Sequence, residues 1–297
     1  MKLATFSALP SGEPRPGLVI GDKRIVDIPA ALGADADTST MVGIVRAGPS
    51  MLARLRDLAA KPPAATLALA DVKLHAPIPR PIKNVFCVGW NYLEHFEEGA
   101  KKLQDNRELP KWPVYFSKAT TAVTGPFDTV PFDEKISTSL DWEVELGVVI
   151  GTGGKNISEG DAMRHVFGYT VINDVSWRDL QRRHGGQWHK GKSLDGTCPM
   201  GPWIVTADSL DPNNLRVACR VNGVTKQDSN TKFLYFKLPR LIADLSAGMT
   251  LEAGDIISTG TPQGVGFART PPEFMKPGDL LETEIEGIGT LRNPIGR

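Results

Sequence analysis

The 297-residue sequence predicts a β-rich α+β fold, with a small N-terminal domain over residues 1–75 and a larger domain over residues 76–297. Two observations predict this fold class. Many short apolar segments of strand length follow residue 75, and turns rich in glycine and proline separate them. Helix-like periodicity is confined to a few short segments, which favours an α+β core over a doubly wound sheet.

The first 75 residues combine strand and helix patterns. Lys2–Phe6 is typical of a strand, and Gly17–Ile28 has the pattern of a β-hairpin. Leucines at one-turn spacing predict a helix over residues 51–58. The proline-rich run Ala76–Pro81 is incompatible with a helix interior, so we place the domain boundary in this extended segment.

The larger domain contains eight expected strands and three expected helices. The strands are Asn84–Val88, Val144–Ile150, Gly168–Asn173, Trp203–Thr206, Arg216–Val221, Asp255–Ser258, Leu280–Ile285 and Gly289–Arg292. The helices are Ser158–His165, Ser176–His184 and Phe236–Leu245. This excess of strands is the main support for a β-rich core.

Charge and composition exclude several classes of protein. Lys and Arg number 34, as do Asp and Glu, and a formal net charge of zero argues against a nucleic-acid partner. Apolar segments fall far below the roughly 20 residues needed to cross a bilayer, so we expect no membrane partner. The three cysteines are far apart and form no CxxC pattern, which favours a reducing, cytoplasmic location.

Two glutamates lie at the start of an apolar strand: Glu143 immediately precedes it, and Glu145 is its second residue. Glu143 and Glu145 are two residues apart, so a strand directs both side chains to the same face. Such neighbouring carboxylates repel each other unless a cation lies between them. The pair indicates either a solvated polar face or a site for magnesium, calcium or manganese, which prefer oxygen ligands.

Asp174 is a candidate third ligand because it follows the apolar strand Gly168–Asn173. The alternative is that Asp174 caps the helix expected from Ser176 onward. Residues 178–192 then carry five basic residues and one acidic residue, a net charge of +4. This run is either a solvated helix face or a positive wall that receives an anionic substrate.

His95 and Glu98 are three residues apart in a short expected helix, so they share one face. A glutamate beside an imidazole orients the ring, and the two together form a general-base dyad that activates water. The alternative is an isolated surface pair.

The segment 258–266 is a glycine-rich loop that follows an expected strand. Its hydroxyls and backbone N–H groups suit a carboxylate or a small phosphate. The loop lacks the lysine of a P-loop and the G-x-G-x-x-G spacing, so the sequence supports neither ATP nor NAD.

Taken together and in order, these motifs resemble the fumarylacetoacetate hydrolase (FAH) family, in its acylpyruvase or 2-hydroxyhepta-2,4-diene-1,7-dioate isomerase-like branch. The resemblance covers about residues 75–297, and the first 75 residues are similar only to the variable N-terminal domain of many members. The matching segments are Val88–Tyr92 with His95, Tyr115–Lys118, Asp141–Leu146, Gly168–Asp179, Gly191–Ser193, Ser258–Pro262 and Leu280–Asn293.

The resemblance implies the FAH-type mixed β-roll in the larger domain, a homodimer, and Mg²⁺ or Mn²⁺ as cofactor. It implies roles for nine residues: metal ligands Glu143, Glu145 and Asp174, catalytic residues His95, Glu98 and Lys192, and substrate-binding residues Arg178, Gln181 and Thr261. The implied substrate is a small anionic 2-oxo acid.

On this basis we expect a metal-dependent hydrolase that cleaves a carbon–carbon bond in an acylpyruvate-like diketo acid. His95, oriented by Glu98, removes a proton from water, and Lys192 stabilises the oxyanion. The alternative on the same site is an oxaloacetate-like 2-oxo acid decarboxylase, or an isomerase or hydratase of 2-hydroxy-diene-dioates. A binding protein without catalysis is the third alternative, and the presence of His95, Glu98 and Lys192 argues against it.

Overall fold

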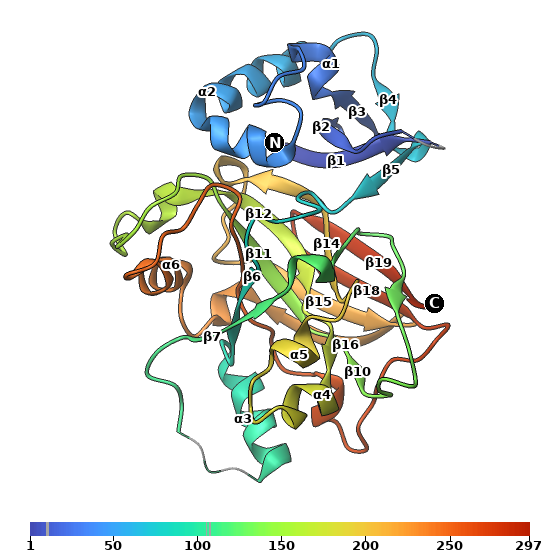
Figure 1. The fold of residues 1–297 in the computed structure, drawn as a ribbon, viewed down its shortest axis with the longest axis vertical. Helices are drawn as coiled ribbons and strands as arrows, with labels where there is room; N and C mark the ends of the chain where they lie inside the picture. The colour runs from blue at the N-terminus through green and yellow to red at the C-terminus, as the bar shows by residue number, and fades with distance from the viewer. Residues whose placement is uncertain (10–11, 105, 107) are drawn as a thin grey trace.

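A computed structural model describes residues 1–9, 12–104, 106 and 108–297 and confirms a β-rich α+β fold. Figure 1 shows the N-terminal residues, in blue, as a compact unit at one end of the strand-rich body. Strands dominate the body, and short helices lie around its rim. The two halves share one extended sheet.

The N-terminal unit contains the strand, hairpin and helix expected there. Its elements are β1 (Lys2–Ala8), β2 (Arg15–Ile20), β3 (Arg24–Asp27), α1 (Ile28–Leu32), α2 (Met41–Ala60), β4 (Leu67–Ala68) and β5 (Val72–His75). The helix α2 is longer than the segment 51–58, and it kinks at Gly48, where φ is 64°. Glycine tolerates this left-handed backbone without steric cost.

The large sheet runs in the order β4-β3-β2-β1-β14-β12-β11-β17-β6-β7, with β5 beside β1 and β8 beside β14. Its remaining strands are β6 (Val85–Gly89), β7 (Val114–Lys118), β8 (Val123–Thr124), β11 (Val144–Ile150), β12 (Val166–Asn173), β14 (Cys198–Thr206) and β17 (Ile256–Ser258). Every residue of β11 and β12 is buried, which explains their nearly continuous apolar sequences.

A second sheet, in the order β16-β15-β18-β19-β9, packs against the first. Its strands are β9 (Val130–Pro131), β15 (Arg216–Val221), β16 (Val224–Asn230), β18 (Leu280–Ile285) and β19 (Gly289–Gly296), while β10 (Leu140–Asp141) pairs with β13 (Ser176–Trp177). One apolar cluster joins residues of both sheets, including Val144, Leu146, Val217 and Leu291. The core therefore lies between the sheets.

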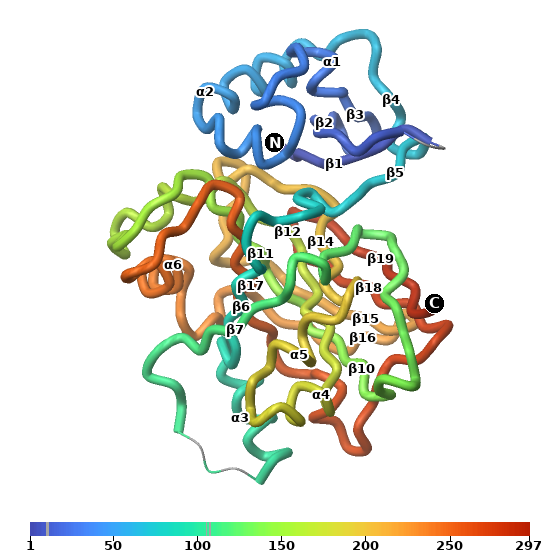
Figure 2. Tube along the Cα trace, in the orientation of Figure 1, coloured from blue at the N-terminus to red at the C-terminus, as the bar shows by residue number. Residues whose placement is uncertain are grey.

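The helices of the body are α3 (Leu93–Leu103), α4 (Arg178–Arg183), α5 (His189–Lys192) and α6 (Leu238–Ser246). Single 3₁₀ turns lie at Leu69–Asp71, Thr120–Ala122, Ala162–His165, Ala207–Ser209, Thr231–Phe233 and Gly266–Ala268. The tube in Figure 2 shows α3, α4 and α5 at the end of the body opposite the N-terminal unit. In addition, α4 contacts α5, and α5 contacts β7.

Two of the three expected helices differ from the structure. Ser158–His165 forms only the 3₁₀ turn Ala162–His165, because Gly160 disfavours a helix interior. The helix expected at Ser176–His184 begins at Arg178, since the two residues before it pair with β10. The strands β7 and β16 were absent from the sequence-based expectation.

The N-terminal unit and the body share a core. The strand β1 pairs with β14, with Lys2 opposite Val205 and Leu3 opposite Ile204. A single buried cluster contains Ile44 and Leu55 of α2 together with residues of β6, β11 and β14. The division of the chain at residue 75 stays a prediction. Among the described residues, no helix is long and apolar enough to cross a membrane.

Removing residues 1–75 should prevent the remaining chain, 76–297, from folding cooperatively. The deletion removes β1, the strand that pairs with β14, and exposes the shared apolar cluster to water. Thermal unfolding followed by circular dichroism, with the full chain as control, checks this expectation. A soluble fragment that unfolds cooperatively near the Tm of the full chain would show that the body is an independent domain.

Candidate functional site

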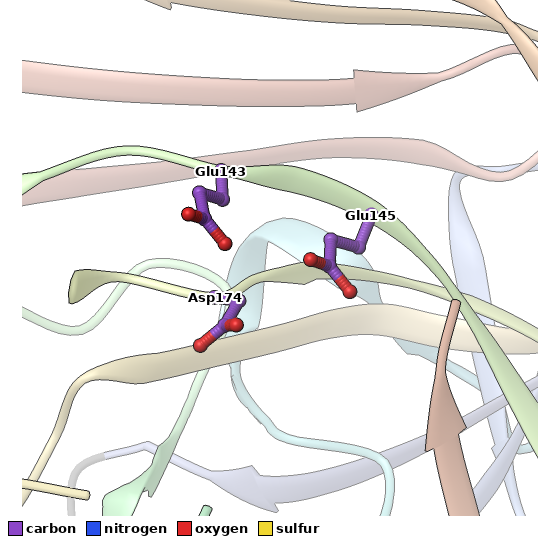
Figure 3. A group of neighbouring side chains, drawn as sticks. All are labelled: Glu143, Glu145 and Asp174. Atoms are coloured by element: carbon purple, nitrogen blue, oxygen red, sulfur yellow. The ribbon is translucent and has the colours of Figure 1, made fainter. Parts of the chain in front are cut away.

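Three carboxylates meet where β11 and β12 lie side by side. Val144 of β11 pairs with Asn173 of β12, so Glu143 lies opposite Asp174. One oxygen of each of Glu143, Glu145 and Asp174 lies within 4.8 Å of the others, and all three side chains are buried. Figure 3 shows the three carboxylates directed toward one another from neighbouring strands. A solvated polar face is therefore excluded.

Asn173 fixes the ends of these strands. Its side-chain oxygen accepts a hydrogen bond from the Glu143 amide at 3.0 Å, and its amide nitrogen donates to Thr283 on the second sheet at 2.9 Å. The backbone amide of Asp174 donates to the Glu143 carbonyl at 2.9 Å. The ligand positions are thus tied to both sheets, and Asp174 is not the cap of α4, which begins at Arg178.

Two buried lysines hold Asp174. Lys192 Nζ lies 2.7 Å from both Asp174 Oδ2 and Glu143 Oε2. Lys118 Nζ lies 2.7 Å from Asp174 Oδ1 and 2.9 Å from the Val175 carbonyl. Lys118 was given no role from the sequence, although Tyr115–Lys118 belongs to the motif that carries the family resemblance. A lysine at the end of an aromatic strand was the available signal.

Arg178 is part of the buried charge network rather than of an open positive wall. Its Nη2 lies 2.7 Å from Glu143 Oε1, and its Nε lies 2.7 Å from Asp141 Oδ2. Asp141 also accepts from the backbone amides of Gly266 and Phe267. These two bonds tie β10, which precedes the strand β11, to the end of the glycine-rich loop. No role was expected for Asp141 from the sequence.

The basic run 178–192 is divided between the interior and the surface. Lys192 and Arg178 are buried, whereas Arg183 and Lys190 are exposed, and Arg183 pairs with Asp179 at 3.2 Å. Three residues of the run, Arg178, Arg182 and Lys192, line the cavity described below, and Arg178 and Lys192 are paired there with buried carboxylates.

The pKa values of the two glutamates shift in opposite directions. Burial alone raises the pKa of Glu143, but Lys192 and Arg178 outweigh it and lower this pKa overall. Burial first, and then the charges of Asp174 and Glu143, raise the pKa of Glu145 well above its ordinary value. Glu145 Oε2 accepts hydrogen bonds from the Ser258 hydroxyl at 2.6 Å and from the Gly260 amide at 2.9 Å.

The charge balance of this centre suits a divalent cation. The carboxylates of Asp141, Glu143, Glu145 and Asp174 exceed the cations Lys118, Arg178 and Lys192 by one negative charge. A divalent cation makes the sum +1, which favours an anionic ligand. Three buried oxygen donors fit Mg²⁺ or Mn²⁺ better than a soft metal. The acidic triad can therefore hold a metal ion.

His95 and Glu98 form a hydrogen-bonded pair on α3. His95 Nδ1 lies 2.9 Å from Glu98 Oε1, and Glu98 Oε2 accepts from the Gly264 amide at 2.9 Å. A carboxylate only accepts, so Nδ1 donates and Nε2 is left as the basic nitrogen. The histidine is only 7% exposed, which excludes an isolated surface pair.

A cavity of about 650 Å³ connects these groups. Seven of the nine predicted site residues line it, namely His95, Glu143, Glu145, Arg178, Gln181, Lys192 and Thr261. Asp174 and Glu98 are not part of the lining. Asp174 contacts the lining residues Lys192 and Glu143, and Glu98 contacts the lining residue His95.

Gln227 and Gln181 organise the polar side of the cavity. The Gln227 amide donates to Thr261 Oγ1 at 2.8 Å, and its oxygen accepts from the Val144 amide at 3.0 Å. Gln181 accepts from Arg178 Nη1 at 3.1 Å. Gln227 was missed because β16, on which it lies, was not expected from the sequence.

The chain is similar to known proteins over most of its length. The family model described as fumarylacetoacetate (FAA) hydrolase C-terminal matches residues 84–296. Oxaloacetate tautomerase YisK of Bacillus subtilis (strain 168) is 46% identical over 292 residues, covering 94% of this chain and 95% of that relative. Mitochondrial oxaloacetate tautomerase Fahd2a of Rattus norvegicus is 43% identical over 298 residues, covering 99% and 91%.

Solved structures give the same fold along the whole chain. Fumarylacetoacetate hydrolase from Exiguobacterium antarcticum superposes with a TM-score of 0.83 at 37% identity, covering 100% of this chain and 99% of that chain. Maleylpyruvate hydrolase from Sphingobium sp. SYK-6, in complex with manganese(II) and pyruvate, has a TM-score of 0.78 at 32% identity and covers 100% and 99%. The chain belongs to the fumarylacetoacetate hydrolase family.

Proposed function

We propose that this protein interconverts the enol and keto forms of an oxaloacetate-like 2-oxo acid in a divalent-metal-dependent reaction. The observation that carries the proposal is a buried acidic triad and a His95–Glu98 pair facing one cavity. Relatives named oxaloacetate tautomerase, 46% and 43% identical, support this chemistry. They support the oxaloacetate-like substrate of the decarboxylase alternative better than the carbon–carbon hydrolysis that was our first expectation, although tautomerisation of oxaloacetate was not itself among the expected reactions.

Glu143, Glu145 and Asp174 are the proposed ligands of the cation. When bound, Mg²⁺ or Mn²⁺ supplies a Lewis acid that polarises the 2-oxo group and stabilises the negative charge of the enolate. The excess negative charge of the buried groups supports a cation here. Lys118 and Lys192 hold the Asp174 carboxylate in a fixed orientation.

His95 is the proposed proton carrier. Its Nδ1 is held by Glu98, so Nε2 is the atom that takes a proton from, or returns it to, carbon 3 of the substrate. The enol hydroxyl loses one proton and carbon 3 gains one, so no water is consumed and no carbon–carbon bond breaks. Lys192 and Thr261 lie in the same lining and supply donors to the substrate oxygens.

Replacing His95 with glutamine should lower the rate of enol loss by about 10²-fold or more, the range expected for a general acid–base. The variant retains a polar side chain but cannot exchange a proton. The decay of enol absorbance measures the rate, with Mg²⁺ present. Mg²⁺ affinity, measured by calorimetry, should stay unchanged; an unaltered tautomerisation rate would remove His95 from the mechanism.

Replacing Glu145 with glutamine should raise the Tm of the metal-free protein and abolish the Tm increase caused by Mn²⁺. The neutral amide removes the repulsion among three buried carboxylates, while its oxygen can still accept from Ser258 and Gly260. Thermal unfolding with and without Mn²⁺ checks both effects. Glu134→Gln, at an exposed position, is the matched control.

The same substitution should flatten the dependence of stability on pH. The pKa of Glu145 is raised in the folded protein, so the folded state holds this proton more tightly than the unfolded chain. Metal-free wild type should therefore lose stability as the pH rises above the ordinary glutamate range, and the variant should lose less. Identical pH profiles would argue that Glu145 is not electrostatically strained.

A further inference from the structure

The cavity is larger than a four-carbon diacid requires. Its volume is about 650 Å³. Oxaloacetate has nine heavy atoms, and even at the roughly 30 Å³ that each water occupies in the liquid they would fill only about 270 Å³. More than half of the space would remain for a substituent.

An aromatic wall, made of Trp90, Phe116 and Trp188, borders this space. The ring centroid of Trp188 lies 5.0 Å from that of Trp90 and 5.1 Å from that of Phe116, both in edge-on contacts. All three residues line the cavity. Edge-on ring contacts of this kind are favourable, and the wall offers an apolar surface to a ligand.

The wall begins beside the charged centre. Lys192 Nζ, which contacts Glu143 and Asp174, lies 5.0 Å from the Phe116 ring centroid. The aromatic series then continues from Phe116 to Trp188 and Trp90. A ligand whose 2-oxo acid group lies at the carboxylate cluster would therefore have its other end along these rings.

Backbone features keep the wall in place. A Cβ at residue 89 would lie 2.5 Å from the Trp188 ring, so only glycine allows this close approach. Trp90 has a φ of 54°, a left-handed backbone that is strained for a bulky side chain. Strain of this kind persists only where the surrounding structure enforces it, and it concentrates at functional sites.

We propose that this cavity accepts 2-oxo acids with an apolar aromatic substituent on carbon 3, the arylpyruvate class, and that the substituent packs against the aromatic wall. The proposal rests on the tautomerase function above and widens its substrate class. The reaction is balanced in the same way: the enol hydroxyl loses a proton, carbon 3 gains one, and the double bond moves from carbon–carbon to carbon–oxygen.

The test compares kcat/KM for the enols of phenylpyruvate and oxaloacetate in the full chain with Mg²⁺, after subtraction of the uncatalysed rate. Wild type should convert both. Trp188→Ala should lower the value for phenylpyruvate about tenfold, the order expected for a lost apolar contact, and change that for oxaloacetate less than about twofold. Trp188→Phe should restore part of the loss. Trp112→Ala, at a tryptophan 63% exposed and outside the cavity lining, is the control.

The outcomes separate this proposal from the proposed function. If wild type converts the oxaloacetate enol but not the phenylpyruvate enol, only the proposal of an aromatic subsite is overturned. That result would indicate that the site recognises a second carboxylate instead. An equal loss with both substrates in Trp188→Ala would also overturn it, because the residue would then be structural. Conversion of neither enol by wild type would overturn the tautomerase function itself.

A measurement on wild type alone covers the case in which Trp188→Ala does not fold. Phenylpyruvate and pyruvate share the 2-oxo acid group and differ by one aromatic ring. As inhibitors of oxaloacetate enol conversion, phenylpyruvate should bind about tenfold more tightly than pyruvate. Equal inhibition constants would contradict a subsite for the ring.

Discussion

The structure depends on the burial of carboxylates that repel one another. One oxygen of each of Glu143, Glu145 and Asp174 lies within 4.8 Å of the others, in a place that water barely reaches. Removing one charge from water costs several kcal/mol unless opposite charges and hydrogen bonds compensate it. Lys118, Lys192 and Arg178 supply most of that compensation. The negative charge that remains is the physical reason for a cation at this point.

The rest of the fold keeps this centre rigid. Asn173 ties the ends of β11 and β12 to the second sheet, and Gln227 joins β11 to the loop that carries Thr261. Hydrogen bonds between elements distant in sequence leave the carboxylates little freedom to separate. Such pre-organisation is what a centre that stabilises an enolate requires, because the stabilising charges must be in place before the reaction begins.

Relatives in the family are named for different reactions, among them oxaloacetate tautomerase and maleylpyruvate hydrolase. Hydrolysis, decarboxylation and tautomerisation of 2-oxo acids all pass through an enolate, and they differ in the bond that breaks and in the destination of the proton. The acidic triad alone therefore did not distinguish a hydrolase from a tautomerase. The choice of a tautomerase depended on the names of the relatives.

The sequence predicted what local patterns determine. The two-residue spacing of Glu143 and Glu145 and the end of the strand at Asp174 left a three-carboxylate cluster as one alternative, and the family resemblance was needed to choose it over a solvated face and a helix cap. Lys118 and Gln227 could not be assigned in the same way, because their contacts arise from the pairing of β6 with β7 and of β15 with β16. The strands β6 and β7 are far apart in sequence and leave no periodic signal near Lys118, whereas β15 and β16 form a hairpin across Asn222-Gly223, a local turn signal from which β16 could have been expected. The helix expected at Ser158–His165 failed for a local reason, a glycine inside it.

Proton NMR of oxaloacetate in D₂O tests the central claim most directly. With Mg²⁺, the protein should accelerate exchange of the carbon 3 protons for deuterium while the four-carbon skeleton stays intact, and chelation of the metal should remove the acceleration. Three-carbon products that accumulate in proportion to the protein, or exchange no faster than in buffer, would contradict the account.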